Sequence, residues 1–316
     1  MLILGGLNEA AGRLDGCSVA IGNFDGVHIG HQTLIAAAGV VAHAGPLVVL
    51  TFAPHPATLL NPSFAPPLIA PLGRRLVWLE QRGVEAVVVQ PFDADFVALT
   101  AEVFVAELVR TLRPDAVTVG FDFSYGAGRA GTVETLNRQL RAVGVEARIL
   151  APVQIAGMRV SSSKVREFVM MGKMEGAALL LGRQYAVWGQ VVHGAGRGGG
   201  LLGVPTLNLK TDHELLPRRG VYATWAVVPG AATPAMSVTN VGRNPTFGDE
   251  ELHIETHVVE PIPEVYGCEV EVRFVSRLRD ERRFPDAASL VAQIHEDIAA
   301  ARRILAGQAP GTVGVG

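Results

Sequence analysis

The chain has 316 residues, of which 49% are hydrophobic and 18% are charged. This length and composition predict one large or two ordinary globular domains and argue against a disordered chain. The net charge is −3, with no basic excess. Nucleic-acid and acidic-membrane binders normally carry such an excess, so we expect neither partner.

The N-terminus and the two cysteines bear on the cellular compartment. Residues 1–6 lack the basic segment of a signal peptide. The most apolar stretch, residues 36–52, is interrupted by a histidine, a glycine and a proline, so it does not predict a membrane-spanning helix. Cys17 and Cys268 form no CxxC pair and are expected to be small buried residues in a reducing cytoplasm rather than a disulfide. We therefore expect a soluble cytoplasmic protein.

The first half of the chain alternates apolar strands with helices. Continuous apolar strands of this kind predict a parallel sheet covered on both faces, that is, a Rossmann-like α/β domain. In such sheets ligands bind where loops follow the carboxyl ends of the strands. The predicted strands are 19–21, 47–52, 86–90, 116–120 and 147–150, and the predicted helices start at residue 32 and cover 73–82, 102–112 and 132–143.

The first predicted strand runs into a loop, residues 22–31, that contains three glycines and two histidines. A strand, a glycine loop and a helix in this order aim backbone N–H groups and the positive helix end at an anion, usually a phosphate. His28 and His31 are three residues apart at the helix start, so their imidazoles are expected to face the same point. The loop therefore predicts a phosphate site.

Two later segments leave alternatives open. Residues 126–131 fit the GxGxxG pattern of dinucleotide-binding loops, but the next strand does not end in the acidic residue that the pattern requires. Arg129, inside this loop, fits either a phosphate-facing residue or an ordinary surface charge. The serines 161–163, followed by Lys164 and Arg166, fit either a capped helix or a second anion-binding segment.

Four motifs of this half together resemble the adenylyltransferase half of bacterial bifunctional riboflavin kinase/FAD synthetases. They are GNFDGVHIGH (22–31), TFAPHP (51–56), VGFDFSYG (119–126) and SSSKVR (161–166). The HxGH sequence alone is shared by the wider nucleotidylyltransferase superfamily, whereas the four motifs in this order are more specific. The family usually has arginine at position 164. Lysine keeps the charge but loses bidentate phosphate binding, so a weak or regulatory N-terminal domain is an alternative.

The resemblance implies an α/β nucleotidyltransferase domain over residues 1–182, which joins FMN to AMP from ATP and releases pyrophosphate. The FMN phosphate attacks the α-phosphorus directly, so His28 and His31 would act by hydrogen bonding to the phosphates. The other ATP- and phosphate-binding residues that it implies are Gly22, Phe24, Asp25, Gly26, Gly30, Ser162, Lys164 and Arg166. On the flavin side we expect His55, Pro56, Asp122, Phe123, Tyr125 and Arg129.

The pattern changes near Gly182, because the strands that follow are separated by turns without intervening helices. This pattern predicts an antiparallel β-barrel over residues 183–306, closed by one or two terminal helices. A frayed tail, residues 307–316, is expected after it. The predicted strands are 184–193, 220–228, 234–241, 252–259 and 269–275, and the predicted helical segment is 286–305.

Polar residues of the second half suggest a phosphate and metal site. Residues 194–199 again fit GxGxxG, but Pro205 forbids the helix that a dinucleotide loop needs. Thr206 and Asn208 face one side if extended, where they either offer the oxygen ligands that Mg²⁺ prefers or stabilise a turn. Glu255 shares a strand face with two histidines, which is either the solvent side or the place of a base for a kinase.

The motifs GVPTLN (203–208), GVYA (220–223) and NVGRNPTF (240–247) resemble the riboflavin kinase half of the same family. The resemblance implies phosphorylation of riboflavin to FMN with ATP and Mg²⁺, with Glu255 as the base and Thr206 and Asn208 as metal ligands. The small-molecule partners are then riboflavin, ATP, FMN and FAD, and the oligomeric state stays open. The implied phosphate-binding residues of this half are Gly194, Arg197, Gly203, Pro205 and Asn240.

A third interpretation comes from another functional class. A zinc- or dinucleotide-binding module could be built on the HxxH pair and the two GxGxxG matches. It lacks a third zinc ligand at the usual spacing, and neither glycine match has its full context.

Overall fold

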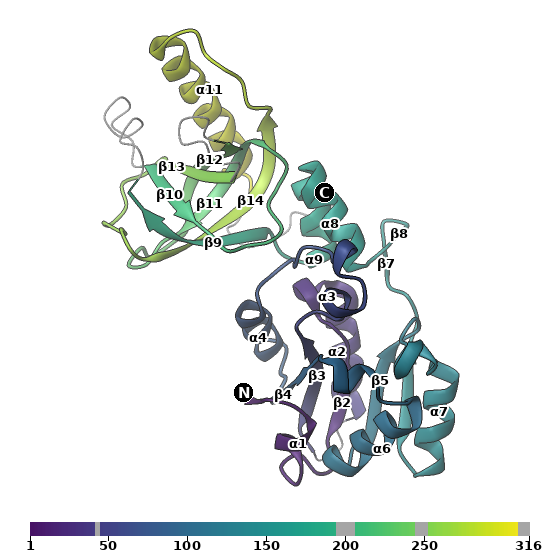
Figure 1. Ribbon diagram of the computed structural model, residues 1–316. Helices are drawn as coiled ribbons and strands as arrows, with labels where there is room; N and C mark the ends of the chain where they lie inside the picture. Colours follow the sequence, from purple (N-terminus) through teal and green to yellow (C-terminus); the bar gives the residue numbers. More distant parts are fainter. Residues whose placement is uncertain (42–44, 194–205, 244–251, 309–316) are drawn as a thin grey trace. The chain divides into compact units, whose positions relative to one another are not determined.

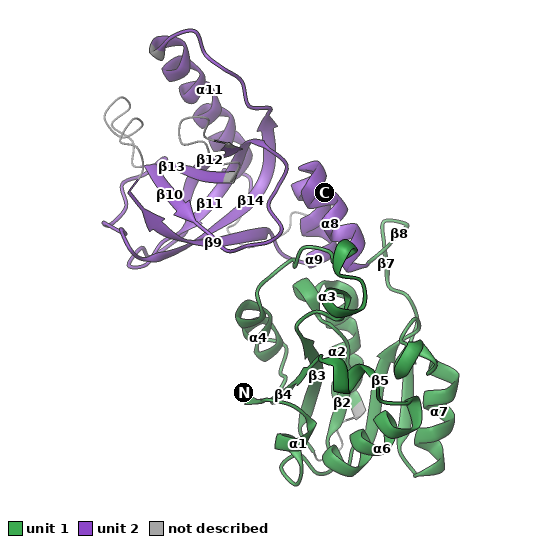
Figure 2. Ribbon diagram, viewed as in Figure 1, with its two compact units in different colours: residues 1–160 green, residues 161–316 purple. Residues whose placement is uncertain are grey.

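A computed structural model describes residues 1–41, 45–193, 206–243 and 252–308 (Figure 1). The chain divides into two compact units, residues 1–160 and 161–316 (Figure 2). The expected boundary lies at residue 182, whereas this division groups α8 (Ser162–Met171) and α9 (Met174–Leu181) with the second unit.

The first unit contains a six-stranded parallel sheet in the order β1-β4-β3-β2-β5-β6. Figure 1 labels its four central strands, β4, β3, β2 and β5. Its strands are β1 (Leu2–Leu4), β2 (Ser18–Ile21), β3 (Leu47–Ala53), β4 (Ala86–Pro91), β5 (Ala116–Gly120) and β6 (Glu146–Leu150). The five predicted strands are confirmed, and β1 was not predicted. A small hairpin, β7 (Gln154–Ile155) and β8 (Met158–Arg159), precedes the end of the unit.

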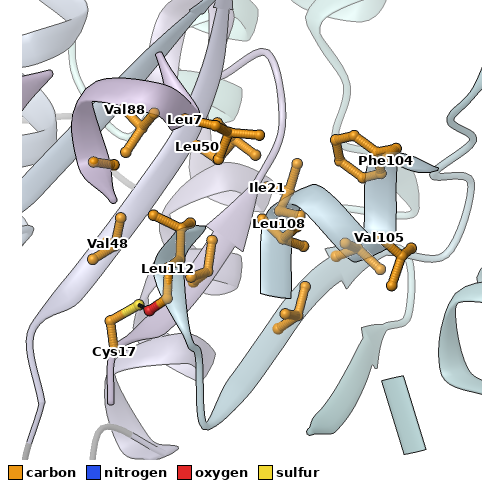
Figure 3. Packing of buried hydrophobic residues seen from close by; sticks show 14 of the residues in the cluster. Leu7, Cys17, Ile21, Val48, Leu50, Val88, Phe104, Val105, Leu108 and Leu112 are labelled. Carbon is orange, nitrogen blue, oxygen red and sulfur yellow. Dashed lines mark hydrogen bonds between the residues drawn. The ribbon is translucent and has the colours of Figure 1, made fainter. Parts of the chain in front are cut away.

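Helices cover both faces of this sheet, because alternate residues of each strand join different cores. The helices are α1 (Leu7–Ala10), α2 (Ile29–Val41), α3 (Pro56–Leu60), α4 (Leu72–Glu80), α5 (Ala94–Val97), α6 (Ala101–Leu112) and α7 (Val133–Ala142). Val19 and Ile21 pack with residues of α1, α6 and α7, whereas Ala20 packs with residues of α2 and α4. The first of these clusters is drawn in Figure 3, where the thiol of Cys17 donates a hydrogen bond to the carbonyl of Leu112 at 3.5 Å.

The strand order reverses at β2, which positions the first site. The chain passes from β2 to β3 on one side and later returns to β5 on the other. The loops that follow β2 and β5 therefore flank the switch point of the sheet, where open α/β sheets bind ligands. The predicted loop 22–31 follows β2, and the VGFDFSYG motif and the GxGxxG segment 126–131 lie at and after the end of β5.

The second unit contains a closed antiparallel barrel in the order β10-β13-β12-β11-β14-β9. Its strands are β9 (Tyr185–Val192), β10 (Thr206–Lys210), β11 (Gly220–Val227), β12 (Ala235–Arg243), β13 (Leu252–Val258) and β14 (Glu269–Arg279). The barrel prediction is confirmed. The sequence offered β10 only as a conditional extended segment.

The barrel interior includes a chain of hydroxyl groups. Thr224, Thr239 and Thr256 are fully buried, and their hydroxyls lie 2.7 and 3.0 Å apart in succession. Helix α11 (Ala287–Leu305) packs on the outside of the barrel against β11, β12 and β14, and α9 contacts β9 and β14. Asp286 caps its N-terminus by accepting a hydrogen bond from the backbone N–H of Ser289 at 2.7 Å.

Candidate active sites

His28 and His31 form a stacked pair at the switch point of the parallel sheet. Their ring centroids are 3.6 Å apart, with planes inclined by 12°. His28 is buried and immediately precedes α2, whereas His31 lies in the first turn of that helix. The structure thus confirms that the two imidazoles lie together, beside the helix N-terminus whose N–H groups attract anions.

The backbone of the loop orients the ring of His28. Its Nδ1 accepts a hydrogen bond from the backbone N–H of His31 at 3.2 Å, so the ring hydrogen of a neutral His28 lies on Nε2. A Cβ atom at Gly30 would lie only 3.1 Å from Cε1 of His28. Glycine at position 30 therefore lets this imidazole lie against the helix start.

The loop holds an uncommon backbone conformation. The φ angles are 49° at Phe24, 73° at Gly26 and 40° at Val27. A positive φ at a β-branched residue is an outlier that persists only where the surroundings enforce it. A Cβ atom at Gly26 would also lie 2.7 Å from Cγ2 of Ile69.

Two buried charged groups fasten this loop to α4 and to the segment that leads into it. The carboxylate of Asp25 accepts hydrogen bonds from the backbone N–H of Ile69 at 3.0 Å and of Ala70 at 3.3 Å. Arg75, 4% exposed, donates from Nη1 to the carbonyl of Asn23 at 3.0 Å. Asp25 was expected among the phosphate-binding residues, and these contacts give it a role in holding the loop. Arg75 was missed, because a lone arginine on a predicted helix carries no signal of what it contacts.

The loop after β3 joins this arrangement through His55. The amide of Asn23 lies 3.5 Å from Nε2 of His55. Nδ1 of His55 accepts a hydrogen bond from the backbone N–H of Ala57 at 3.2 Å and so caps α3, which begins at Pro56. The structure therefore brings His55 to the phosphate loop.

The loop after β5 contains the other residues that were expected to bind the flavin. Tyr125 is buried in the core, where its hydroxyl donates to Oε1 of Gln139 at 2.7 Å, and its ring stacks on Phe123. Asp122 and Arg129 are exposed, and Nε of Arg129 donates to the hydroxyl of Ser124 at 2.8 Å. These contacts give Tyr125 a packing role whether or not the flavin reaches it.

The expected second anion-binding segment lies on α8, in the second unit. Ser161 is the N-cap, since its hydroxyl accepts a hydrogen bond from the backbone N–H of Lys164 at 3.2 Å. Ser162 is the first residue of the helix, and Arg166 is buried. The ammonium of Lys164 pairs with Oε1 of Glu167 at 2.7 Å and lies over the ring of Phe168.

The barrel brings three of the expected kinase residues side by side. Glu255 of β13 pairs in register with Asn208 of β10 on one side and with Asn240 of β12 on the other. Ile254 and Thr256, the neighbours of Glu255 on β13, are buried in the barrel interior. Because successive side chains of a strand point to opposite faces, Glu255 and its two register partners share the outer face. Residues up to 47 positions apart in the sequence thus form one continuous row.

The next step along the ladder pairs Thr206 with His257. The hydroxyl of Thr206 lies 3.0 Å from Nδ1 of His257. Burial lowers the pKa of His257, and the charge of Asp297 on α11 acts in the opposite direction. Sequence reasoning noted this histidine only as a neighbour on the face of Glu255.

The electrostatics of the row suit a base. Burial raises the pKa of Glu255; the positive charge of His253 lowers it, and the charge of Glu281 raises it further. Glu281 accepts a hydrogen bond from the amide of Asn240 at 3.4 Å and pairs with Arg219 at 3.1 Å. Glu281 and Arg219 were missed because their distance from Glu255 in the sequence hides their proximity.

The remaining expected residues and alternatives are placed as follows. Gly194, Arg197, Gly203 and Pro205 lie outside the described residues. Among the residues that the structure describes, no group of three or more His, Cys, Asp or Glu side chains is placed to hold a metal ion. The described helices include none that is long and apolar enough to cross a membrane.

Two family models match the two halves of the chain. The model described as FAD synthetase matches residues 11–164, and the model described as riboflavin kinase matches residues 181–305. A solved structure described as a macrolide-efflux protein from Streptococcus pneumoniae is 30% identical, with a TM-score of 0.86. The match covers 95% of this chain and 98% of that one.

Curated relatives match along almost the whole chain. The bifunctional riboflavin kinase/FMN adenylyltransferase of Escherichia coli strain K12 is 34% identical over 95% of this chain and 96% of its own length. The Haemophilus influenzae enzyme of the same name is 32% identical over 96% and 98%. That of Bacillus subtilis is 34% identical over 88% and 89%. This chain therefore belongs to the family of bifunctional riboflavin kinase/FMN adenylyltransferases.

Proposed function

We propose that residues 183–306 of this bifunctional enzyme phosphorylate riboflavin to FMN with ATP, and that residues 1–182 adenylylate FMN to FAD. The observation that supports this division is the presence of two separate constellations. One is the row Asn208–Glu255–Asn240 of the barrel. The other is the stacked pair His28–His31 of the parallel sheet. The matches to both family models favour the bifunctional interpretation over a kinase with a regulatory first half.

The kinase step assigns Glu255 the role of general base. Its carboxylate accepts the proton of the terminal ribityl hydroxyl as that oxygen attacks the γ-phosphorus of ATP, and ADP leaves. A carboxyl group whose pKa is raised by burial is a stronger base than one in water. Asn208 and Asn240, its register neighbours, orient the reacting groups by hydrogen bonding.

Thr206 and Asn208 fit a magnesium site. Both offer neutral oxygens on one strand face beside the Glu255 carboxylate, and hard oxygen ligands are what Mg²⁺ prefers. When bound with ATP, this ion neutralises phosphate charge. We infer that Thr206 and Asn208 hold it and that Glu255 stays available to the substrate hydroxyl.

The adenylyl transfer step needs no protein nucleophile. An oxygen of the FMN phosphate attacks the α-phosphorus of ATP, the bond to the β-phosphate breaks, and pyrophosphate leaves. Nε2–H of His28 donates a hydrogen bond to the phosphates, beside the N-terminus of α2 and His31. Lys164 and Arg166 are assigned to the same phosphates on the basis of the SSSKVR motif, and Asn23 and His55 to the flavin side.

The substrates also suggest where the enzyme works. Riboflavin, ATP, FMN and FAD are its small-molecule partners, and no basic surface for nucleic acid is expected at a net charge of −3. We propose a cytoplasmic location, where ATP is available.

One coupled assay tests the division. Wild-type enzyme, His28→Ala and Glu255→Gln are each incubated with riboflavin, ATP and Mg²⁺, and the flavins are separated by chromatography over time. His28→Ala should accumulate FMN without FAD. Glu255→Gln should leave riboflavin unchanged yet convert added FMN to FAD. Each variant's intact activity shows that it is folded, and equal damage to both reactions by both variants would contradict the assignment.

A further inference from the structure

We propose that His257 is a positioning residue for the kinase site, which orients the hydroxyl of Thr206 toward the metal-bound nucleotide. The inference rests on the proposed role of Thr206 as a metal ligand. It concerns a residue that touches neither substrate nor metal in the proposed mechanism and that acts through its neighbour.

The barrel ladder fixes the geometry. Thr206 and His257 are register partners on β10 and β13, and Oγ1 of Thr206 lies 3.0 Å from Nδ1 of His257. The Asn208–Glu255 pair stands two residues further along the same strands, which is about 7 Å. Both pairs lie on the same outer face of the barrel. His257 is therefore one ladder step away from the proposed base and contacts the proposed metal ligand directly.

The number of hydrogens and lone pairs on a hydroxyl decides which atom should donate in the Thr206–His257 contact. A threonine hydroxyl has one hydrogen and two acceptor lone pairs. If the hydrogen is donated to Nδ1 of His257, both lone pairs remain for a cation. Without His257 the hydroxyl rotates freely, and in part of its rotamers the hydrogen points toward the cation and opposes binding. Groups that fix metal ligands in this way typically change metal affinity 10- to 100-fold.

The charged group that acts on His257 from α11 is Asp297. This residue is 4% exposed. Its carboxylate accepts two hydrogen bonds from Arg279 of β14, at 2.7 and 2.9 Å, and a third from Gln293 at 2.9 Å. The charged group of α11 that faces His257 is thus itself held by the barrel.

Calorimetry without turnover gives the direct test. Binding of a non-hydrolysable ATP analogue to the full-length protein is measured with and without Mg²⁺ for wild type, Thr206→Ala, His257→Ala and the double variant. His257→Ala should weaken the Mg²⁺-dependent affinity about 10-fold. In the Thr206→Ala background the same change should cause no further loss, because its effect passes through that hydroxyl. His257→Asn, whose amide oxygen takes the place of Nδ1, should restore affinity to within about threefold of wild type.

Kinetics and a control complete the experiment. We expect His257→Ala to raise KM for Mg·ATP in FMN formation more than it lowers kcat. His295→Ala, on the exposed side of α11, should bind the nucleotide like wild type. Independent, additive losses in the double variant, or an Asn variant no better than Ala, would overturn the inference while leaving the role of Thr206 intact. If Thr206→Ala itself binds Mg²⁺ and nucleotide normally, the proposed metal site and this inference both fail.

Discussion

The two units differ in the structure that carries their phosphate-handling site, which is a loop in the first unit and regular strands in the second. In the first, the site lies in a loop at the switch point of a sheet, and buried groups fasten its backbone, with Arg75 on one carbonyl and Asp25 on two N–H groups. In the second, the row Asn208–Glu255–Asn240 projects from regular strands, and the ladder places it. A loop site thus depends on tight local backbone packing, and a ladder site depends on register.

This difference predicts where each activity is vulnerable. Adenylyl transfer should respond to small steric changes near the loop that leave the fold intact. The kinase should respond to changes that disturb the barrel interior, because the interior sets which residues pair.

Gly30→Ala should separate activity from stability in the first unit. An added Cβ at 3.1 Å from Cε1 of His28 forces the imidazole to move, while alanine suits a helix better than glycine. We expect FAD formation from FMN to fall about 10- to 100-fold without loss of thermal stability. The matched control is Gly39→Ala in the same helix, where the Cβ meets Leu47 at an ordinary 3.6 Å. Equal rates for the two variants would contradict the steric argument.

Thr239→Val should test the barrel interior. The change keeps the shape of the side chain but leaves the buried hydroxyls of Thr224 and Thr256 without this partner. The free energy of unfolding of the barrel should fall by about 1–3 kcal/mol, measured by urea denaturation. Ser276→Ala, at a half-buried position of β14, should change it by less than about 0.5 kcal/mol. A neutral Thr239→Val would mean that the hydroxyl chain is dispensable.

The core of the first unit should weaken in alkaline solution through Cys17. Burial raises the pKa of this thiol from 9.0 to about 12. Because the folded value is the higher one, the stabilisation is complete below pH 9 and is lost as the pH rises toward 12. Between pH 8 and pH 10 wild type should lose ~1.4 kcal/mol that Cys17→Ala does not lose, as read from urea midpoints. An identical loss in both proteins would exclude the thiol as the cause.

Lys164→Arg should have the smallest effect. Members of the family that the sequence resembles usually have arginine at this position, and arginine binds phosphate in a bidentate manner. FAD formation from FMN should rise by about two- to fivefold in kcat/KM, since one further charge-assisted hydrogen bond contributes on the order of 1 kcal/mol. FMN formation should stay at the wild-type rate and serves as the control. A decrease would indicate that the ion pair with Glu167 matters more than bidentate binding.

The regular parts of both units could be predicted from the sequence because their periodicity is local. Apolar runs of three to six residues located β2 to β6, and the loss of helical segments after Gly182 indicated the barrel. The edge strand β1 was missed, because only the four-residue helix α1 follows it, whereas the 13-residue helix α2 follows β2. Strand β10 was read only as a conditional extended segment, because its five residues follow a proline- and glycine-rich stretch.

The candidate sites were predictable to the extent that their motifs are contiguous. HxGH placed His28 and His31 together because three residues are one helical turn. The partners that hold each site in place come from distant segments, as Arg75 does for Asn23 and His257 does for Thr206. Those contacts depend on the register between strands and on the packing of helices on loops. Neither can be predicted from one contiguous segment of the sequence.

Closure of the barrel also bears on aggregation. Among the described strands, those of the barrel all have neighbours on both sides, so they offer no edge to another chain. The parallel sheet ends in β1 and β6. β6 carries the ion pair between Arg148 and Glu146 at 2.7 Å, and β1 has only three residues. Charge and brevity are the features that keep exposed strand edges from pairing. Resistance to edge-to-edge association thus rests on geometry in one unit, and on one ion pair and a short strand in the other.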